Sequence, residues 1–262
     1  MRELTRAPSA ESVDRGEAIA FHLGEPISPD ALKGAKALVH CAYDFEARGW
    51  PEIEKRNVQG AAQLFEAAKA AGVEQIVCIS TMSAFTGCKS LYGRAKLEIE
   101  VLASRGGALI LRPGLIWGAG AGGMYGSLER QIAGGKILPL IGGDQILYLI
   151  YQEDLCRVIH RYCAKEFTAP AAPVTAAHDQ PWTFRAILEE IARGAGKRVR
   201  FLPIPWRAVW LVLKTAETCG LRLNFRSDSL VSLMNQNAHP DFSQGSKIGF
   251  APRPFRASEA RS

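Results

Sequence analysis

Short apolar runs alternate with longer amphipathic stretches through the first half of the chain. Four runs have the length and composition of buried strands: EAIAFHL at 17–23, LVHCAY at 38–43, QIVCIS at 75–80 and ALILRPG at 108–114. Residues 57–71 instead repeat apolar side chains at helical spacing, and Gly72 follows as a stop signal. The helix face comprises Val58, Ala61, Leu64, Phe65, Ala68 and Ala71. This alternation predicts an α/β fold with a doubly wound parallel sheet.

After residue 117, the alternation of apolar runs and amphipathic stretches is less regular. A helix is predicted at 181–196, where Thr183 is a capping residue and Phe184, Ile187 and Ile191 share one face. Residues 229–255 carry mainly loop signals. We therefore expect residues 1–117 to form the core, and residues 118–262 to supply the remaining strands interleaved with a small C-terminal substrate lobe.

The stretch IPWRAVWLVLKTAE at 204–217 is apolar on nearly every side of a helix. Such a helix can lie on a membrane surface or pack in a core or dimer interface. The near-complete ring of apolar residues favours core or dimer packing.

Composition narrows the functional classes. Hydrophobic residues make up 47% of the 262 residues, charged ones 22%, and the net charge is +6. Basic residues alternate with Glu, as in EIEKR at 52–56, which indicates solvated helix faces and excludes a nucleic-acid stripe. The five histidines lack metal-ligand spacing, and no apolar run is long enough to span a bilayer. Six scattered cysteines and the lack of a signal peptide favour a reduced, cytoplasmic protein.

The stretch STMSAFTGCKSLYGRAKLEIE at 80–100 carries the candidate chemistry. Tyr92 and Lys96 are four residues apart, so their side chains lie on one helix face. A phenol with an ordinary pKa near ~10 is a weak base at neutral pH, and a neighbouring ammonium group favours its ionised form. Such a tyrosine can accept a proton from a substrate hydroxyl while hydride leaves the same carbon. A tyrosine and a lysine at this spacing also occur together by chance on charged surface helices.

Several motifs together are more specific. The chain resembles the extended short-chain dehydrogenase/reductase superfamily, whose NAD-dependent epimerase/dehydratase-like branch has a Rossmann-like fold. The resemblance runs over nearly the whole chain and rests on five segments: LKGAKALVHCAY at 32–43, NVQGAAQLFEAAKAAGVEQIVCISTMSAF at 57–85, YGRAKLEIE at 92–100, LRPGLIWG at 111–118 and YQEDLCRVI at 151–159.

The resemblance implies catalytic roles for three residues. Tyr92 would be the base, Lys96 would lower its pKa and bind the nicotinamide ribose, and Thr81 would orient the substrate oxygen. Ser83 competes with Thr81 if the strand ends later. Met82 and Ser83 stand where the 4,6-dehydratases of the family carry an Asp–Glu pair. Those enzymes need the two acidic residues to remove water, so a dehydratase reaction is not expected here.

The resemblance also implies a cofactor, NAD or NADP. Arg6 lies where a basic residue would meet a 2′-phosphate, which favours NADP, although a surface arginine is an equal alternative. Glu25 replaces the aspartate that commonly meets the adenine amino group. Further cofactor contacts are expected from Ser80, Tyr92, Lys96 and Pro113, and from His40 and Ala42 at the end of the 38–43 run. A core role for His40 is an equal alternative.

One part of the family pattern is missing. Family members open with a strand and a GxxGxxG loop that holds the pyrophosphate, whereas ELTRAPSAE at 3–11 already resembles the second strand. We expect an N-terminally truncated sheet with a gap where the first strand would lie, closed by different pairing or left open because the chain starts downstream of its true start. GAGAGG at 118–123 fits GxGxxG, but its position favours a flap over the substrate.

Two functions follow from the resemblance. The first is an NAD(P)-dependent epimerase or oxidoreductase that acts on a hydroxyl or carbonyl of a small-molecule substrate, with a nucleotide-sugar as the expected class. Arg226 is a candidate partner for a substrate phosphate, or an ordinary surface residue. The alternative is a catalytically degenerate relative that binds a partner or nucleotide without turnover. The resemblance further implies a homodimer through the Tyr–Lys helix and its neighbour.

Overall fold

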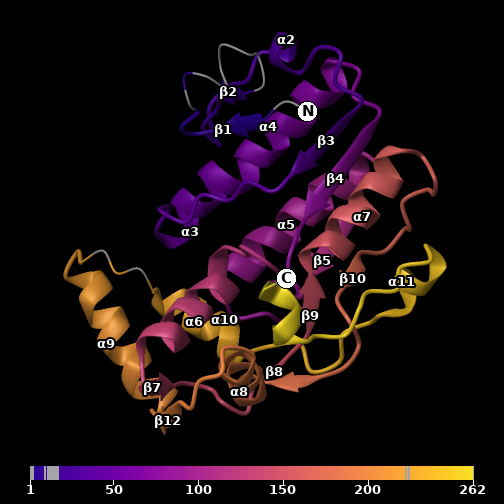
Figure 1. Cartoon of the computed structure of the whole chain (residues 1–262). Helices are drawn as coiled ribbons and strands as arrows, with labels where there is room; N and C mark the ends of the chain where they lie inside the picture. The colour runs from indigo at the N-terminus through magenta and orange to yellow at the C-terminus, as the bar shows by residue number, and fades with distance from the viewer. Residues whose placement is uncertain (1–2, 9, 11–17, 222, 224, 262) are drawn as a thin grey trace.

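Four parallel strands form the central sheet, in the order β10-β5-β4-β3 (Figure 1). The computed structural model describes residues 3–8, 10, 18–221, 223 and 225–261. In the sheet, β3 (Ala37–His40) pairs with β4 (Gln75–Ile79), β4 with β5 (Leu109–Pro113), and β5 with β10 (Val174–Ala176). Val77 is the register partner of both Val39 and Leu109. The predicted parallel sheet is confirmed.

Helices cover both faces of this sheet. One core contains Leu64 and Phe65 of α4 (Gly60–Ala70) and Ile99 of α5 (Leu91–Arg105). The opposite core contains Leu155 and Val158 of α7 (Gln152–Cys163). The doubly wound α/β architecture predicted from the alternation of strands and helices is therefore confirmed. Of the helix predicted at 57–71, residues 57–59 belong to the π-helical turn η1 (Glu54–Gln59), which follows α3 (Gly49–Ile53), and residues 60–70 form α4.

The N-terminal strands form a sheet of their own. β1 (Glu3–Thr5) pairs in parallel with β2 (Ala18–Ala20), and α2 (Pro29–Leu32) follows. Within the described residues, β1 does not pair with β3, so no new pairing closes the sheet (Figure 1). Ser9 and Glu11 of the predicted strand exit, and Glu17 of the predicted strand at 17–23, lie outside the described residues.

The C-terminal half supplies β10 to the sheet and builds a lobe around a third core, which includes Trp117, Tyr125 and Ile187. Its remaining elements are β6 (Leu115–Trp117), α6 (Gly123–Gly134), β7 (Ile137–Leu140), β8 (Ile146–Leu147), β9 (Leu149–Tyr151), β11 (Trp182–Thr183), α8 (Phe184–Gly194), β12 (Arg200–Pro203), α9 (Trp206–Thr218), α10 (Ser227–Met234), α11 (Ser243–Lys247) and the 3₁₀ helix η2 (Ala257–Arg261). The Thr183 hydroxyl caps α8 as predicted, accepting from Ala186 N at 3.1 Å.

The loop prediction for 229–255 is confirmed over most of that stretch, but two short helices, α10 and α11, occupy part of it. Leu230 of α10 is fully buried, and α10 packs against α5 and α9. Tertiary contacts thus stabilise a helix too short to show in the sequence. For residues 204–217, the core-packing alternative is wrong, because Leu213 is the only buried residue of α9. The dimer alternative stays a prediction. None of the described helices is long and apolar enough to cross a membrane.

Candidate active site

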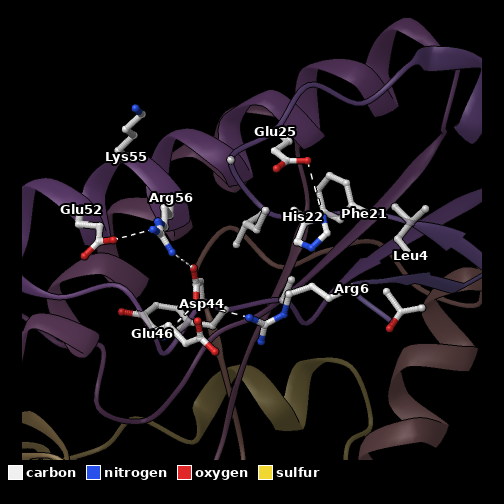
Figure 2. A pocket seen from close by; sticks show the side chains of 15 residues that line it. Leu4, Arg6, Phe21, His22, Glu25, Asp44, Glu46, Glu52, Lys55 and Arg56 are labelled. Carbon is white, nitrogen blue, oxygen red and sulfur yellow. Dashed lines mark hydrogen bonds and ion pairs between the residues drawn. The ribbon is translucent and has the colours of Figure 1, made fainter. Parts of the chain in front are cut away.

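A cavity of about 840 Å³ lies where β1 and β2 face the end of β3 (Figure 2). Its walls come from β1 and its exit, the segment after β2, the segment after β3, and η1. We call it the first cavity. Three predicted cofactor residues, Arg6, Glu25 and Ala42, line it. It occupies the gap between the two sheets.

Asp44 is the electrostatic centre of the first cavity. Its carboxylate accepts from Arg56 Nη1 at 2.9 Å and lies 3.6 Å from Arg6 Nη1, while Arg56 also pairs with Glu52 at 2.7 Å (Figure 2). Burial opposes ionisation of Asp44, but the hydrogen bonds from Arg56 and from Glu46 N, with the charge of Arg6, lower its pKa. Arg6 is therefore oriented by Asp44 within the cavity wall.

A second cavity, of about 390 Å³, lies at the carboxyl ends of β4 and β5. Five predicted residues line it: Ser80, Thr81, Tyr92, Lys96 and Pro113. The carboxyl ends of parallel strands meet at one sheet edge, which is why segments distant in sequence converge there. Tyr43 lines both cavities, so the two adjoin.

Tyr92 and Thr81 share a side-chain hydrogen bond in the second cavity. Burial raises the pKa of Tyr92, and the hydrogen bond to Thr81 lowers it in part. Ser83, the alternative to Thr81, does not line the cavity, and its hydroxyl accepts from Ser232 Oγ at 2.9 Å. The structure thus places Thr81, rather than Ser83, beside the phenol.

Lys96 is directed at the sheet. Its ammonium group donates to Ile79 O at 2.9 Å, and burial lowers the pKa of Lys96. Lys96 was expected to lower the pKa of Tyr92. In this structure burial raises the pKa of Tyr92, and the hydrogen bond to Thr81, not the charge of Lys96, opposes that rise. The side chains share a helix face, but the carbonyl at the end of β4 holds the ammonium group.

Buried polar contacts hold helix α5, which carries Tyr92 and Lys96, against the strand ends. Glu100, one turn after Lys96, accepts from Ser80 Oγ at 2.5 Å and from Arg112 at 2.6 and 2.8 Å. At Gly93 an added Cβ would lie 2.4 Å from Ser83 O, so glycine permits the close approach of α5 to the β4 exit.

The start of α5 is held from the other lobe. Asp228 of α10 accepts from the backbone amides of Leu91 at 2.8 Å and Tyr92 at 3.1 Å, and the Ser90 hydroxyl accepts from Gly93 N at 3.0 Å. These contacts satisfy amides that lack partners within the helix, and a carboxylate there is stabilised by the helix dipole.

The glycine run at 118–123 lies beside the second cavity. Gly122 and Gly123 line it at the start of α6, next to Met124. Gly118 and Gly120 have positive φ angles of 147° and 67°. This position agrees with a segment over the substrate and places the run outside the first cavity wall.

Two candidate residues have structural surroundings. His40 lines neither cavity; it is 1% exposed, its ring meets Phe65 edge-on at 5.3 Å, and its nitrogens find no hydrogen-bond partner among the described residues. Burial, with the charge of Lys96, lowers the His40 pKa to about 3, so the ring is neutral. Arg226 donates to Phe45 O at 2.8 Å and Ala47 O at 3.2 Å, and therefore holds a loop.

Sequence reasoning missed two aromatic residues of the site. Tyr43 meets the Tyr92 ring edge-on at 4.9 Å, and Phe45 stacks on it at 5.8 Å. The only signal was their position at the end of the 38–43 run, where Tyr43 is the last residue, and just after it. Asp228 and Glu100 were missed as well, because such long-range partners have no local pattern. The described residues contain no cluster of His, Cys, Asp or Glu able to hold a metal ion.

A parallel sheet with a Tyr–Lys helix beside its carboxyl edge defines a Rossmann-like protein of the extended short-chain dehydrogenase/reductase class. Residues 3–172 match the family model described as "NAD dependent epimerase/dehydratase family". The chain belongs to that family, which confirms the resemblance seen in the sequence.

The individual proteins that this chain resembles are each less than 30% identical to it. A ceramide reductase from Caulobacter vibrioides (strain NA1000 / CB15N) is 28% identical over 192 residues, which cover 72% of this chain and 60% of that protein. UDP-glucuronic acid 4-epimerase from Bacillus cereus, in complex with UDP-glucuronic acid and NAD, has a TM-score of 0.69 at 16% identity, covering 95% of this chain and 82% of that one. RMD from Pseudomonas aeruginosa, complexed with NADPH, has 0.64 at 16% identity, covering 93% and 88%.

Proposed function

We propose that this protein is an NAD(P)-dependent oxidoreductase or epimerase in which Tyr92 moves the proton of a substrate hydroxyl. The observation that carries the proposal is the Tyr92–Thr81 hydrogen bond inside the second cavity, with Lys96 one turn along the same helix. The family match and the nucleotide-bound structural neighbours support it.

The residues present fit a dinucleotide at its two ends. The two cavities adjoin at Tyr43, so one elongated molecule can occupy both. Arg6, Glu25 and Ala42 would hold the adenosine end in the first cavity, and Tyr92 and Lys96 the nicotinamide ribose in the second. Bound there, the cofactor supplies the hydride acceptor or donor.

The chain's own residues then handle the proton. When an alcohol is oxidised, its O–H proton passes to the Tyr92 oxygen as the C–H hydrogen leaves as hydride; reduction of a carbonyl runs in reverse, with Tyr92 as proton donor. Thr81 donates a hydrogen bond that favours the phenolate and orients the substrate oxygen. Tyr43 and Phe45 shield the phenol from water. Glu100 and Arg112 position Ser80 at the strand end.

The first substrate class is a nucleotide-sugar, supported by the Bacillus cereus epimerase neighbour. A second class is favoured by the lining of the second cavity, where Lys96 is the sole charged side chain among the described residues. A diphosphate needs more cationic partners than that, whereas an uncharged amphiphile does not. The relative named a ceramide reductase supports this second class.

The test pairs cofactor binding with turnover. Titration with NADH and NADPH, followed by fluorescence, should give saturable binding, and UDP-sugars and ceramide serve as substrate probes. Tyr92→Phe should lower turnover by about 10²–10⁴-fold with cofactor affinity nearly unchanged, because only the proton-transfer group is lost. Tyr162→Phe, on α7 and outside both cavities, is the matched control.

Retained turnover in Tyr92→Phe would remove the tyrosine from the base role. Cofactor binding by the wild type without turnover of any probe would favour the alternative, a degenerate relative that binds nucleotide only. Failure of a folded protein to bind either cofactor would overturn the proposal for this chain.

A further inference from the structure

The positive charge of the chain is concentrated in one segment. Residues 197–226 contain seven Lys or Arg residues and one acidic residue, Glu217. The remaining 232 residues contain 25 basic and 25 acidic residues, so the net charge of +6 belongs to this segment. Glu217 is itself engaged, accepting from Ser227 N at 2.8 Å and from its hydroxyl at 2.6 Å.

The same segment exposes large apolar side chains. On α9, Leu211 is 61% exposed and Val212 is 67% exposed. At about 100° per residue, these two share the outer face with the exposed Arg207 and Lys214, opposite the buried Leu213. Trp210 is half-buried at the edge of this face next to Lys214, whereas the half-buried Trp206 lies on the side of Leu213.

Large apolar side chains are also exposed in the segments that flank α9 along the chain. Leu202 of β12, before the helix, is 58% exposed; Leu221 and Phe225, after it, are also exposed. Figure 1 shows α9 (orange) at the edge of the molecule, away from the central sheet, and it packs against α10. We call Leu202, Arg207, Leu211, Val212, Lys214, Leu221 and Phe225 the α9 surface.

We propose that the α9 surface docks on a lipid bilayer with anionic headgroups. Apolar side chains on one side of a helix, with tryptophan and basic residues at the boundary, are the features of helices that lie in a membrane interface. The basic excess complements an anionic headgroup layer, to which each nearby Lys or Arg adds attraction. A second copy of the chain fits less well, because a symmetric contact would bring the same basic residues of both copies together.

The α9 surface is connected to the second cavity. The segment after α9 leads to Arg226, which holds Phe45 O, and Phe45 lines the cavity. Asp228, two residues on, holds the Tyr92 amide. If the proposed function holds, docking brings a membrane-borne hydroxyl or carbonyl close to Tyr92; the docking itself does not depend on that function.

Vesicle sedimentation of the full chain tests the docking without any activity readout. The probes are vesicles of phosphatidylcholine alone and of phosphatidylcholine mixed with phosphatidylglycerol. We expect binding to the anionic vesicles, little to the neutral ones, and release at high salt. The double variant L211S/V212S should lower affinity about tenfold or more because it removes the inserted groups.

Charge and matched controls complete the design. R207Q/K214Q should weaken binding to anionic vesicles by about 25-fold, at about fivefold for each basic residue. Val101→Ser, at a residue of α5 that is 55% exposed, should bind like the wild type. Circular dichroism checks that each variant is folded.

Three results would overturn the proposal: no binding of the wild type to anionic vesicles, equal binding by the wild type and L211S/V212S, or a homodimer in solution that L211S/V212S dissociates, which would make a second copy the occupant. Vesicle binding without turnover leaves the docking intact and counts against the proposed function alone.

Discussion

The two cavities adjoin, but the charged groups in their walls have different surroundings. The wall of the first cavity carries ionised groups in mutual contact, with Asp44 between Arg6 and Arg56. In the second, Lys96 is buried and Tyr92 is half-buried, and burial disfavours the ionised form of each. A charged wall suits recognition of an anionic ligand, whereas a wall with few charges makes proton transfer sensitive to single hydrogen bonds.

The largest expected effect concerns His40, a buried residue that lines neither cavity but lies within the electrostatic influence of Lys96 in the second. Its folded pKa, about 3, lies below the ordinary 6.5, so between these values the unfolded chain binds a proton that the folded chain does not, and stability falls as the pH falls. His40→Leu should remove this loss, which amounts to about 3 kcal/mol between about pH 7 and about pH 4. Urea unfolding at both pH values measures it.

His239→Leu, at an exposed histidine, is the control substitution. An equal pH dependence in wild type and His40→Leu would show that His40 is protonated normally in the folded protein.

Thr81→Val should have the next largest effect, on the second cavity alone. The substitution removes the hydrogen bond that lowers the Tyr92 pKa. Turnover should fall by about 10–100-fold, and the rise of alcohol oxidation with pH should move to higher pH. A pH–rate profile of kcat checks both. Ser83→Ala should change neither; a larger loss in that variant would transfer the orienting role to Ser83.

Arg6→Ala should have the smallest effect, on the first cavity. The side chain is about half exposed and paired with Asp44, so its contribution is screened by water. If it meets a 2′-phosphate, NADPH affinity should fall by about fivefold, with NADH affinity unchanged. Fluorescence titration of both nucleotides measures this, with Arg48→Ala as the control. A parallel loss for both nucleotides would contradict a role in choosing between them.

Elements that bury one continuous apolar face could be predicted from the sequence. Periodicity at 57–71 and the runs at 75–80 and 108–114 located α4, β4 and β5 because each buries a continuous apolar face. The Tyr–Lys spacing located the second cavity. Tyr43, Glu100 and Asp228 were not predictable, since their roles arise from contacts between segments that the sequence separates. The exposed face of α9 was missed for a related reason. The sequence shows that the helix is apolar, but only the packing of other segments decides which of its side chains are buried.

The cap on α5 sets an order of folding events during synthesis. Tyr92 lies in a helix whose first amides are completed by Asp228, made 136 residues later. A nascent chain that has emerged only to α9 can form the central sheet and α5, yet the amide of its tyrosine still lacks this partner. The helix that bears Tyr92 is thus completed only after Asp228 has been made and α10 has packed against α5.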